Sequence, residues 1–169
     1  HYPLRRQRQM CIRDSVETLR RNQEVSALGV AAPGFVSKDR AVVHHAPNIA
    51  WRDEPLRARL EDLLSLDVTL DNDANAAGWA EYRFGAAQGS AVMVMLTLGT
   101  GVGGAIVLDG ALFRGANGMA AELGHITSTL GGRECGCGQR GCLEQYASGR
   151  ALQRAIAEVP EGALSLIHI

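Results

Sequence analysis

The strongest constraint on the fold of this chain is a cluster of metal-ligand residues in its C-terminal half. One histidine and three cysteines follow one another at short spacings, as His125, Cys135, Cys137 and Cys142. Zinc binds imidazole and thiolate ligands in tetrahedral geometry, and a site in which the protein supplies all four ligands is structural. The sequence therefore predicts a structural Zn²⁺ that fastens the loop before Glu144.

Two other interpretations of this cluster stay open. Disulfide bonding is disfavoured because no secretory signal is recognisable and a Cys-x-Cys spacing holds its thiols too close for an easy bridge. A zinc module for nucleic acid would present a basic surface. The segment instead carries Arg133 and Arg140 against Glu134 and Glu144.

Composition narrows the classes of partner. The chain has 169 residues, 46% of them hydrophobic, with 17 basic and 18 acidic side chains and a net charge of -1. The length and the hydrophobic content are enough for a buried core in one domain or two small lobes. The net charge gives no electrostatic footprint for nucleic acid or an anionic membrane. No apolar run approaches the roughly 20 residues of a spanning helix. We expect a soluble cytoplasmic protein whose partners are small molecules.

Both ends of the sequence look unrelated to the middle. Residues 1–15 are rich in arginine without helical or strand periodicity, and residues 164–169 are a short apolar run. We interpret both as non-native scar and exclude them from the fold, with a frayed native terminus as the alternative. Cys11 lies in the first of these segments and is left out of the metal site.

The remaining sequence alternates apolar runs with helical patterns, which is typical of an α/β protein. Strands are expected at residues 25–32, 68–70, 92–98 and 105–108, and helices at residues 56–64, 74–84 and 143–157. The strand at 92–98 is almost continuously apolar, which predicts that both its faces are covered. Asp109-Gly110 signals a hairpin, and the last helix is interrupted near Gly149.

A glycine loop follows the strand at residues 92–98. It reads Gly99-Thr100-Gly101, then Val102 and two more glycines. Backbone N–H groups in such a loop can converge on an anion, and the threonine hydroxyl adds a donor. Phosphate binding and a plain tight turn are both open from this motif alone. It is not a Walker loop, because no Gly-Lys-Ser/Thr follows.

Short polar side chains gather where the strand at residues 68–70 meets the next helix, as Asp71, Asn72 and Asp73. Open α/β sheets bind ligands outside the carboxyl ends of their strands, and a carboxylate there can accept a proton from a substrate hydroxyl. Asp73 is our candidate general base. Plain helix capping is the alternative. Glu122, His125 and Glu144 frame the metal loop and would suit sugar hydroxyls.

Four motifs in this order resemble the ROK family of sugar kinases and sugar-responsive repressors, and most closely its bacterial glucokinases. They are DNDANAAGWAEYRFGAAQG, LTLGTGVGGAIV, AELGH and CGCGQRGCLEQYASG. The resemblance runs from about residue 25 to residue 157. It implies the actin-like ATPase (ribonuclease H-like) fold, in part, with a zinc-stabilised loop. Residues 16–89 would belong to the N-terminal lobe and residues 90–163 to the C-terminal lobe.

The resemblance also implies a role for each matching position. Asp73 would be the catalytic base that accepts the proton of the glucose 6-hydroxyl. The glycine loop would hold the phosphates of ATP, which binds with Mg²⁺. His125 would serve both the metal and the sugar. The sugar-binding positions would be Gly34, Asn72, Asp73, Glu122, His125 and Glu144, with Asn48 less firmly, and the phosphate-binding positions Gly99, Thr100 and Gly101.

The sequence departs from the family pattern at both ends. No Asp-x-Gly-Gly-Thr motif precedes Val25, and no adenosine-binding segment follows Ile169. We therefore expect an internal fragment, inactive alone, of a homo-oligomeric kinase. A sugar-responsive repressor and a kinase for another hexose, such as N-acetylmannosamine, are the alternatives, and polyphosphate is an alternative donor.

Overall fold

The computed structural model describes residues 2–46, 49 and 51–159. Asn48 and residues 164–169, on which two of the sequence expectations fall, lie outside this part of the chain. In the described ranges no helix combines the length and the apolar character that crossing a membrane requires. The elements follow one another as α1 (Tyr2–Arg20), β1 (Ala27–Ala32), β2 (Phe35–Val36), β3 (Val43–Ala46), β4 (Trp51–Glu54), α2 (Leu56–Leu64), β5 (Asp67–Asn72), α3 (Asp73–Phe84), β6 (Val92–Leu98), β7 (Val102–Leu108), β8 (Ala111–Leu112), η1 (Leu123–His125), α4 (Glu144–Ala147) and α5 (Gly149–Ala157).

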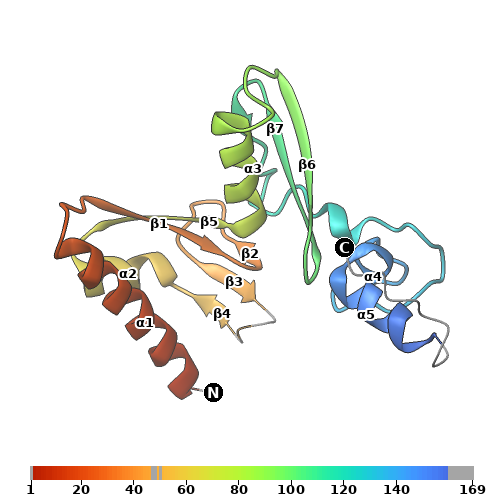
Figure 1. Ribbon diagram of the computed structural model, residues 1–169, viewed down its shortest axis with the longest axis horizontal. Helices are drawn as coiled ribbons and strands as arrows, with labels where there is room; N and C mark the ends of the chain where they lie inside the picture. Colours follow the sequence, from red (N-terminus) through yellow and green to blue (C-terminus); the bar gives the residue numbers. More distant parts are fainter. Residues whose placement is uncertain (1, 47–48, 50, 160–169) are drawn as a thin grey trace, which may run out of the picture.

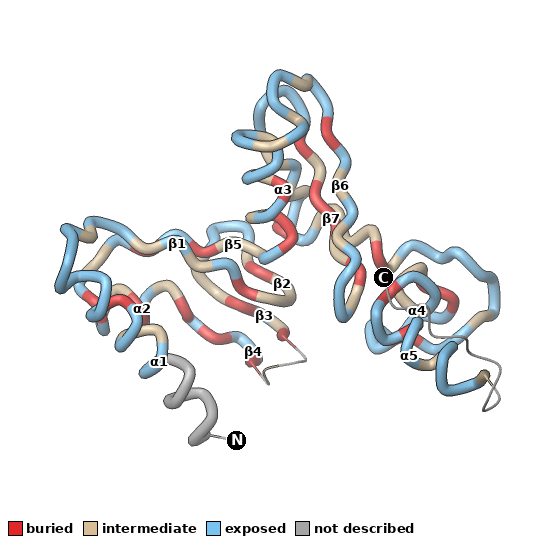
Figure 2. Tube along the Cα trace, viewed as in Figure 1, coloured by how far each residue is buried: buried red, intermediate tan, exposed pale blue. Residues whose placement is uncertain are grey.

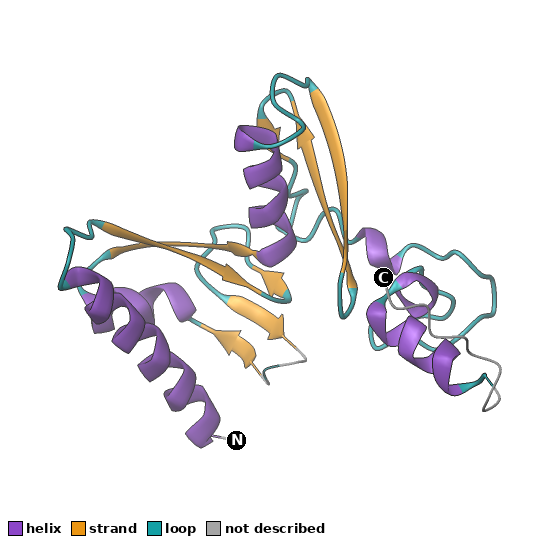
Figure 3. Ribbon diagram, viewed as in Figure 1, coloured by secondary structure: helices purple, strands orange, loops and turns teal. Residues whose placement is uncertain are grey.

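The described residues form three small sheets (Figure 1). β1 and β5 pair in parallel, from Ala27 opposite Asp67 to Ala32 opposite Asn72. β2, β3 and β4 form an antiparallel sheet, and so do β6, β7 and β8. Figure 3 shows helices and strands interleaved along the chain, which confirms the α/β class.

The first core forms around α2. Its leucines Leu56, Leu60 and Leu64 recur every four residues, so they share one helical face, and all three are buried. They cluster with Val68 and Leu70, the buried positions of β5. The helix expected at residues 56–64 thus begins and ends as predicted and fixes β5, the strand that leads to Asp73.

Residues 2–15, which show no periodicity in the sequence and are excluded from the expected fold, lie in a helix. α1 spans Tyr2–Arg20, with Val16 buried and Ile12 packed against the first core. These two apolar positions lie four residues apart, one helical turn, a short pattern that the surrounding arginines conceal. Arg20 Nη2 donates to the carbonyl of Leu64 at 2.8 Å and ties α1 to α2. That this segment is non-native scar stays a prediction.

Helix α3 connects the first core with the β6–β7 hairpin. It begins where β5 ends and then runs along β6 and β7 (Figure 1). Gly78 allows this close packing, because a Cβ atom at this position would collide with the Cβ of Ala105 in β7. α3 therefore places the residues at its N-terminus between the two parts of the chain.

The expectation that both faces of β6 are covered is wrong for the described residues. Met93 is buried, but every second residue is exposed on the other face, with Val94 at 62% and Leu98 at 69% (Figure 2). α3 covers one face of the hairpin, and no described element lies over the other. A continuous apolar run cannot by itself distinguish one buried face from two.

The hairpin expected at residues 109–110 and the helix interruption expected near Gly149 are confirmed. Asp109 and Gly110 have positive φ values of 46° and 81°, as a two-residue hairpin loop between β7 and β8 needs. α4 and α5 are separated at Ser148, whose backbone is extended and whose side chain caps α5.

Candidate active site and metal centre

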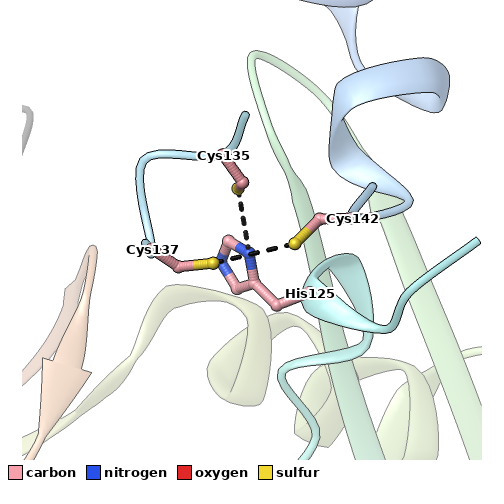
Figure 4. Close-up of side chains that lie close together, drawn as sticks. All are labelled: His125, Cys135, Cys137 and Cys142. Carbon is pink, nitrogen blue, oxygen red and sulfur yellow. Dashed lines mark hydrogen bonds between the residues drawn. The ribbon is translucent and has the colours of Figure 1, made fainter. Parts of the chain in front are cut away.

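The predicted metal ligands lie together. The ligand atoms of His125, Cys135, Cys137 and Cys142 are all within 4.8 Å of one another (Figure 4). His125 comes from η1, and the cysteines come from the long loop that precedes α4. Backbone hydrogen bonds shape this loop: Cys135 N–H donates to Gln139 O at 2.9 Å, and Gly138 N–H donates to Cys135 O at 3.0 Å. The cluster therefore closes one end of the loop.

The spacing of the ligand atoms fits tetrahedral zinc. Zn–S bonds of about 2.3 Å and Zn–N bonds of about 2.05 Å imply S···S separations of about 3.8 Å and S···N separations of about 3.6 Å. Cys137 Sγ lies 3.7 Å from Cys142 Sγ, and Cys135 Sγ lies 3.5 Å from His125 Nδ1. All four positions are supplied by protein, as in a structural site.

The thiols differ in acidity. Burial, the largest influence on Cys135, raises its pKa, but hydrogen bonds from Cys137, Gln145 and Cys142 outweigh it and lower the pKa to about 7. Burial, followed by hydrogen bonds with Cys137 and Cys135, raises the pKa of Cys142 to about 12. Without a metal, Cys142 thus keeps its proton at neutral pH.

At the β5–α3 junction, the N-cap of the helix and the candidate base are neighbouring residues. Asn72 is the N-cap of α3: its Oδ1 accepts from Asn75 N–H at 3.0 Å, and its Nδ2 donates to Gly34 O at 3.0 Å. Gly34 has φ of +91°, and a Cβ atom there would collide with the carbonyl of His45. Asp73 is exposed, and its Oδ1 accepts from Ala74 N–H at 2.9 Å. Asn72 therefore caps α3, and Asp73, an exposed residue, bonds an N–H group at the start of the helix with one of its two carboxylate oxygens.

Three carboxylates approach one another in the site. Burial raises the pKa of Glu122, electrostatic interaction with His125 opposes this rise, and the neighbouring carboxylates of Asp73 and Glu144 add to it. A group of this kind, desolvated and close to other acids, is typical of functional sites.

The glycine loop offers free donors. Its turn is closed by Gly99 N–H, which donates to Gly101 O at 2.9 Å. The N–H groups of Thr100 and Gly101 have no acceptor among the described residues. Glu144 Oε2 accepts from Val102 N–H at 3.0 Å and holds the far side of the loop. Two adjacent free N–H groups match the phosphate-binding alternative for this loop.

One open cleft of about 1040 Å³ brings these groups together. A cleft of this size can take a drug-sized ligand or larger. Cys137 faces the cleft, whereas Cys135 and Cys142 do not line it. The predicted site residues along its wall are Gly34, Asn72, Asp73, Gly99, Thr100, Gly101, Glu122, His125 and Glu144.

Sequence reasoning missed two arginines and a glutamine in the same cleft. Arg150 and Arg154 of α5 line it, and Arg154 Nη2 donates to the Gln145 carbonyl at 2.8 Å. Gln145 Nε2 in turn donates to Cys135 Sγ at 3.5 Å. The spacing of the two arginines, four residues apart on a helix that follows the metal ligands, is the sequence signal that could have found them.

Comparison with known proteins shows the family of the chain. The ROK family model matches residues 7–168. A glucokinase of Streptomyces coelicolor is 50% identical over 143 residues, which are 85% of this chain and 45% of the relative. The xylose repressor of Bacillus subtilis is 36% identical over 129 residues, 76% of this chain and 33% of the relative.

A solved structure is similar as well. The crystal structure of a ROK family glucokinase from Streptomyces griseus in complex with glucose and AMPPNP is 49% identical, with a TM-score of 0.80, over 89% of this chain and 50% of that chain. This chain thus spans about half the length of the relatives it matches. It shares the actin-like ATPase fold of its neighbours in part, and with the family match over residues 7–168, the chain belongs to the ROK family.

Proposed function

We propose that the protein containing this chain is a glucokinase, which transfers the γ-phosphoryl group of ATP to the 6-hydroxyl of glucose with Asp73 as general base. The supporting observation is that one cleft is lined both by Asp73, which is exposed, and by Thr100 and Gly101, whose N–H groups have no acceptor among the described residues. The similar Streptomyces griseus structure is a complex with glucose and AMPPNP.

The residues divide the reaction between them. Asp73 accepts the proton of the 6-hydroxyl while that oxygen forms a bond to the γ-phosphorus and the bond to the leaving ADP oxygen breaks. Thr100 and Gly101 donate to phosphate oxygens, and Mg²⁺ enters with the nucleotide. Phosphoryl transfer depends mainly on positioning and charge stabilisation, so no covalent intermediate with the protein is needed.

The sugar lies in the acidic part of the cleft in this proposal. Asn72 has one amide hydrogen left after it binds Gly34, and Glu122 and Glu144 are acceptors for hydroxyl groups. His125 directs Nδ1 toward the cysteines, which leaves Nε2 for the sugar. Bound zinc would fix the position and the tautomer of this imidazole.

A sugar-responsive repressor is the second candidate, because the Bacillus subtilis xylose repressor is also a relative. The two functions differ in their use of the glycine loop, which a repressor does not need for phosphate. The test is a coupled assay for ADP formation by the full-length protein, with glucose or N-acetylmannosamine and with ATP or polyphosphate as donor, beside equilibrium sugar binding. Turnover of glucose with ATP supports the kinase. Sugar binding without turnover by either donor contradicts it and supports the repressor.

A further inference from the structure

The glycine loop is held at both ends by one short segment. Val102 N–H donates to Glu144 Oε2 at 3.0 Å, and Gly149 N–H donates to Gly99 O at 2.7 Å. Glu144 and Gly149 are the first residues of α4 and α5. The segment that begins at Cys142, the last metal ligand, therefore reaches the loop before and after its free donors.

The contacts are too close to be incidental. A Cβ atom at Gly101 would collide with the Glu144 carboxylate. A Cβ atom at Gly149 would lie 3.0 Å from Gly99 O, closer than ordinary van der Waals contact. Among the described residues, the bond from Gly99 N–H to Gly101 O is the one backbone bond within the loop outside the β6–β7 pairing, so the outer contacts also help to fix the shape of the loop.

The segment from Cys142 to Gly149, which we call the clamp, is fixed by its own hydrogen bonds and by burial. Cys142 is fully buried and forms an antiparallel bridge with Thr127, and Leu143 N–H donates to Ile126 O at 2.9 Å. Ser148 Oγ accepts from Ala151 N–H at 3.1 Å and caps α5. The metal cluster, the clamp and the glycine loop thus form one continuous set of contacts.

We propose that Glu144 and Gly149 are positioning residues that hold the glycine loop in the shape that receives the nucleotide phosphates. The inference rests on the proposed kinase function. Glu144 Oε2 is bound to the loop, and Oε1 has no hydrogen-bond partner among the described residues, so in the proposed function sugar and nucleotide share this side chain. Binding of one substrate should then change the affinity for the other, and by the same factor.

The backbone allows a sharp test at position 149. Gly149 is the first residue of α5, where proline is well tolerated because its missing N–H has no helical partner. Ser148 already has φ of -85° and ψ of 164°, the conformation that a following proline requires. Gly149→Pro removes the donor to Gly99 O and places its Cδ where the amide hydrogen lies, so it forces the loop away from α5 while suiting the first turn of the helix. Gly149→Ala is the matched control, since it adds the same Cβ atom, 3.0 Å from Gly99 O, and keeps the donor.

Both variants are made in the full-length zinc-loaded protein, and the dissociation constant of AMPPNP is measured. Loss of the hydrogen bond and displacement of the loop by Cδ should weaken AMPPNP binding by at least about threefold in Gly149→Pro relative to Gly149→Ala. The glucose affinity measured without nucleotide and the zinc content should agree between the two variants. A merely structural role would instead lower glucose affinity and zinc content together. Equal AMPPNP affinity in the two variants would overturn the proposal.

Glu144 supplies an independent test in case Gly149→Pro does not fold. Glu144→Gln keeps an oxygen that can accept from Val102 N–H, whereas Glu144→Ala removes it. AMPPNP affinity, measured without sugar, should be retained by Glu144→Gln and lost by Glu144→Ala. Equal loss in both variants would overturn the clamp. Absence of AMPPNP binding by the unaltered protein would overturn the proposed function itself, and this outcome is seen before any variant is compared.

Discussion

Arg114 and Asp71 form an ion pair that joins the loop after β8 to the end of β5, with 2.5 Å between Nη2 and Oδ2. The other oxygen of Asp71 accepts from Asn72 N–H at 2.9 Å and from Asn75 Nδ2 at 3.4 Å. One carboxylate thus organises the junction that presents Asp73. The pair is mostly buried, with 15% of the Asp71 side chain and 27% of the Arg114 side chain exposed.

Breaking this pair should destabilise the protein. Arg114→Met leaves the Asp71 carboxylate without its cation, and we expect a loss of about 1–3 kcal/mol in the free energy of unfolding. In the double variant, Asp71→Asn removes the unpaired carboxylate that Arg114→Met leaves behind. The double variant should therefore lose less stability than the sum of the two single variants, by about 0.5–3 kcal/mol. Denaturant unfolding of the single and double variants measures this coupling, and strictly additive effects would contradict it.

Asp73→Asn should preserve the fold and remove most of the kinase rate of the full-length protein. An amide cannot accept the hydroxyl proton, and general base catalysis contributes about 10²- to 10⁴-fold. Asp109→Asn is the control, because it makes the same chemical change in the β7–β8 turn, where asparagine tolerates positive φ. We expect kcat to fall only in the first variant. A loss of less than tenfold would count against Asp73 as the base.

Metal binding should depend on Cys142 and on pH. Cys142→Ser should abolish stoichiometric zinc binding, whereas Cys11→Ser should not, because Cys11 is exposed and outside the cluster. Zinc must displace the proton of the Cys142 thiol, whose pKa is raised to about 12, so zinc affinity should rise about tenfold per pH unit for each proton displaced. Competition with a chelator at several pH values measures this slope. A pH-independent affinity would contradict thiolate ligation.

Glu122 should make stability depend on pH. Burial raises its folded-state pKa above the unfolded value, so its stabilising contribution is present below the unfolded pKa and is lost as the pH rises through the folded pKa. Glu122→Gln should remove this loss and stabilise the ligand-free protein at neutral pH. Glu24→Gln, at an exposed position, is the control. Free energies of unfolding are measured from below the unfolded pKa of Glu122 to above its folded pKa. Their slope against pH should differ from that of the unaltered protein in Glu122→Gln and should not differ in Glu24→Gln.

The bare face of β6 should tolerate polar substitution. Leu96 is 50% exposed, so Leu96→Thr should change the free energy of unfolding by no more than about 0.5 kcal/mol and should reduce binding of a hydrophobic dye. Leu70 is fully buried, and Leu70→Ala should cost about 2–5 kcal/mol. A large stability loss in Leu96→Thr would mean that the face is covered in solution.

The sequence by itself determined the local features of this protein. The spacing of His125 and the cysteines, the leucine periodicity of α2 and the Asp109–Gly110 turn all depend on residues close together in the chain, so their patterns could be interpreted directly. Resemblance to the ROK family then assigned roles to positions such as Asp73 and Thr100. Those roles remain proposals, although the structure brings the residues into one cleft.

Only the tertiary structure decided the contacts between distant segments. The short strands β2, β3 and β4 were not expected, because two to four residues carry little periodicity. Arg114 meets Asp71 across 43 residues and Glu144 meets Val102 across 42, separations at which no local pattern selects a partner. Whether one or both faces of β6 are covered likewise depends on which elements pack against it. These contacts follow from the packing of the whole chain, since burial is settled by neighbours in space.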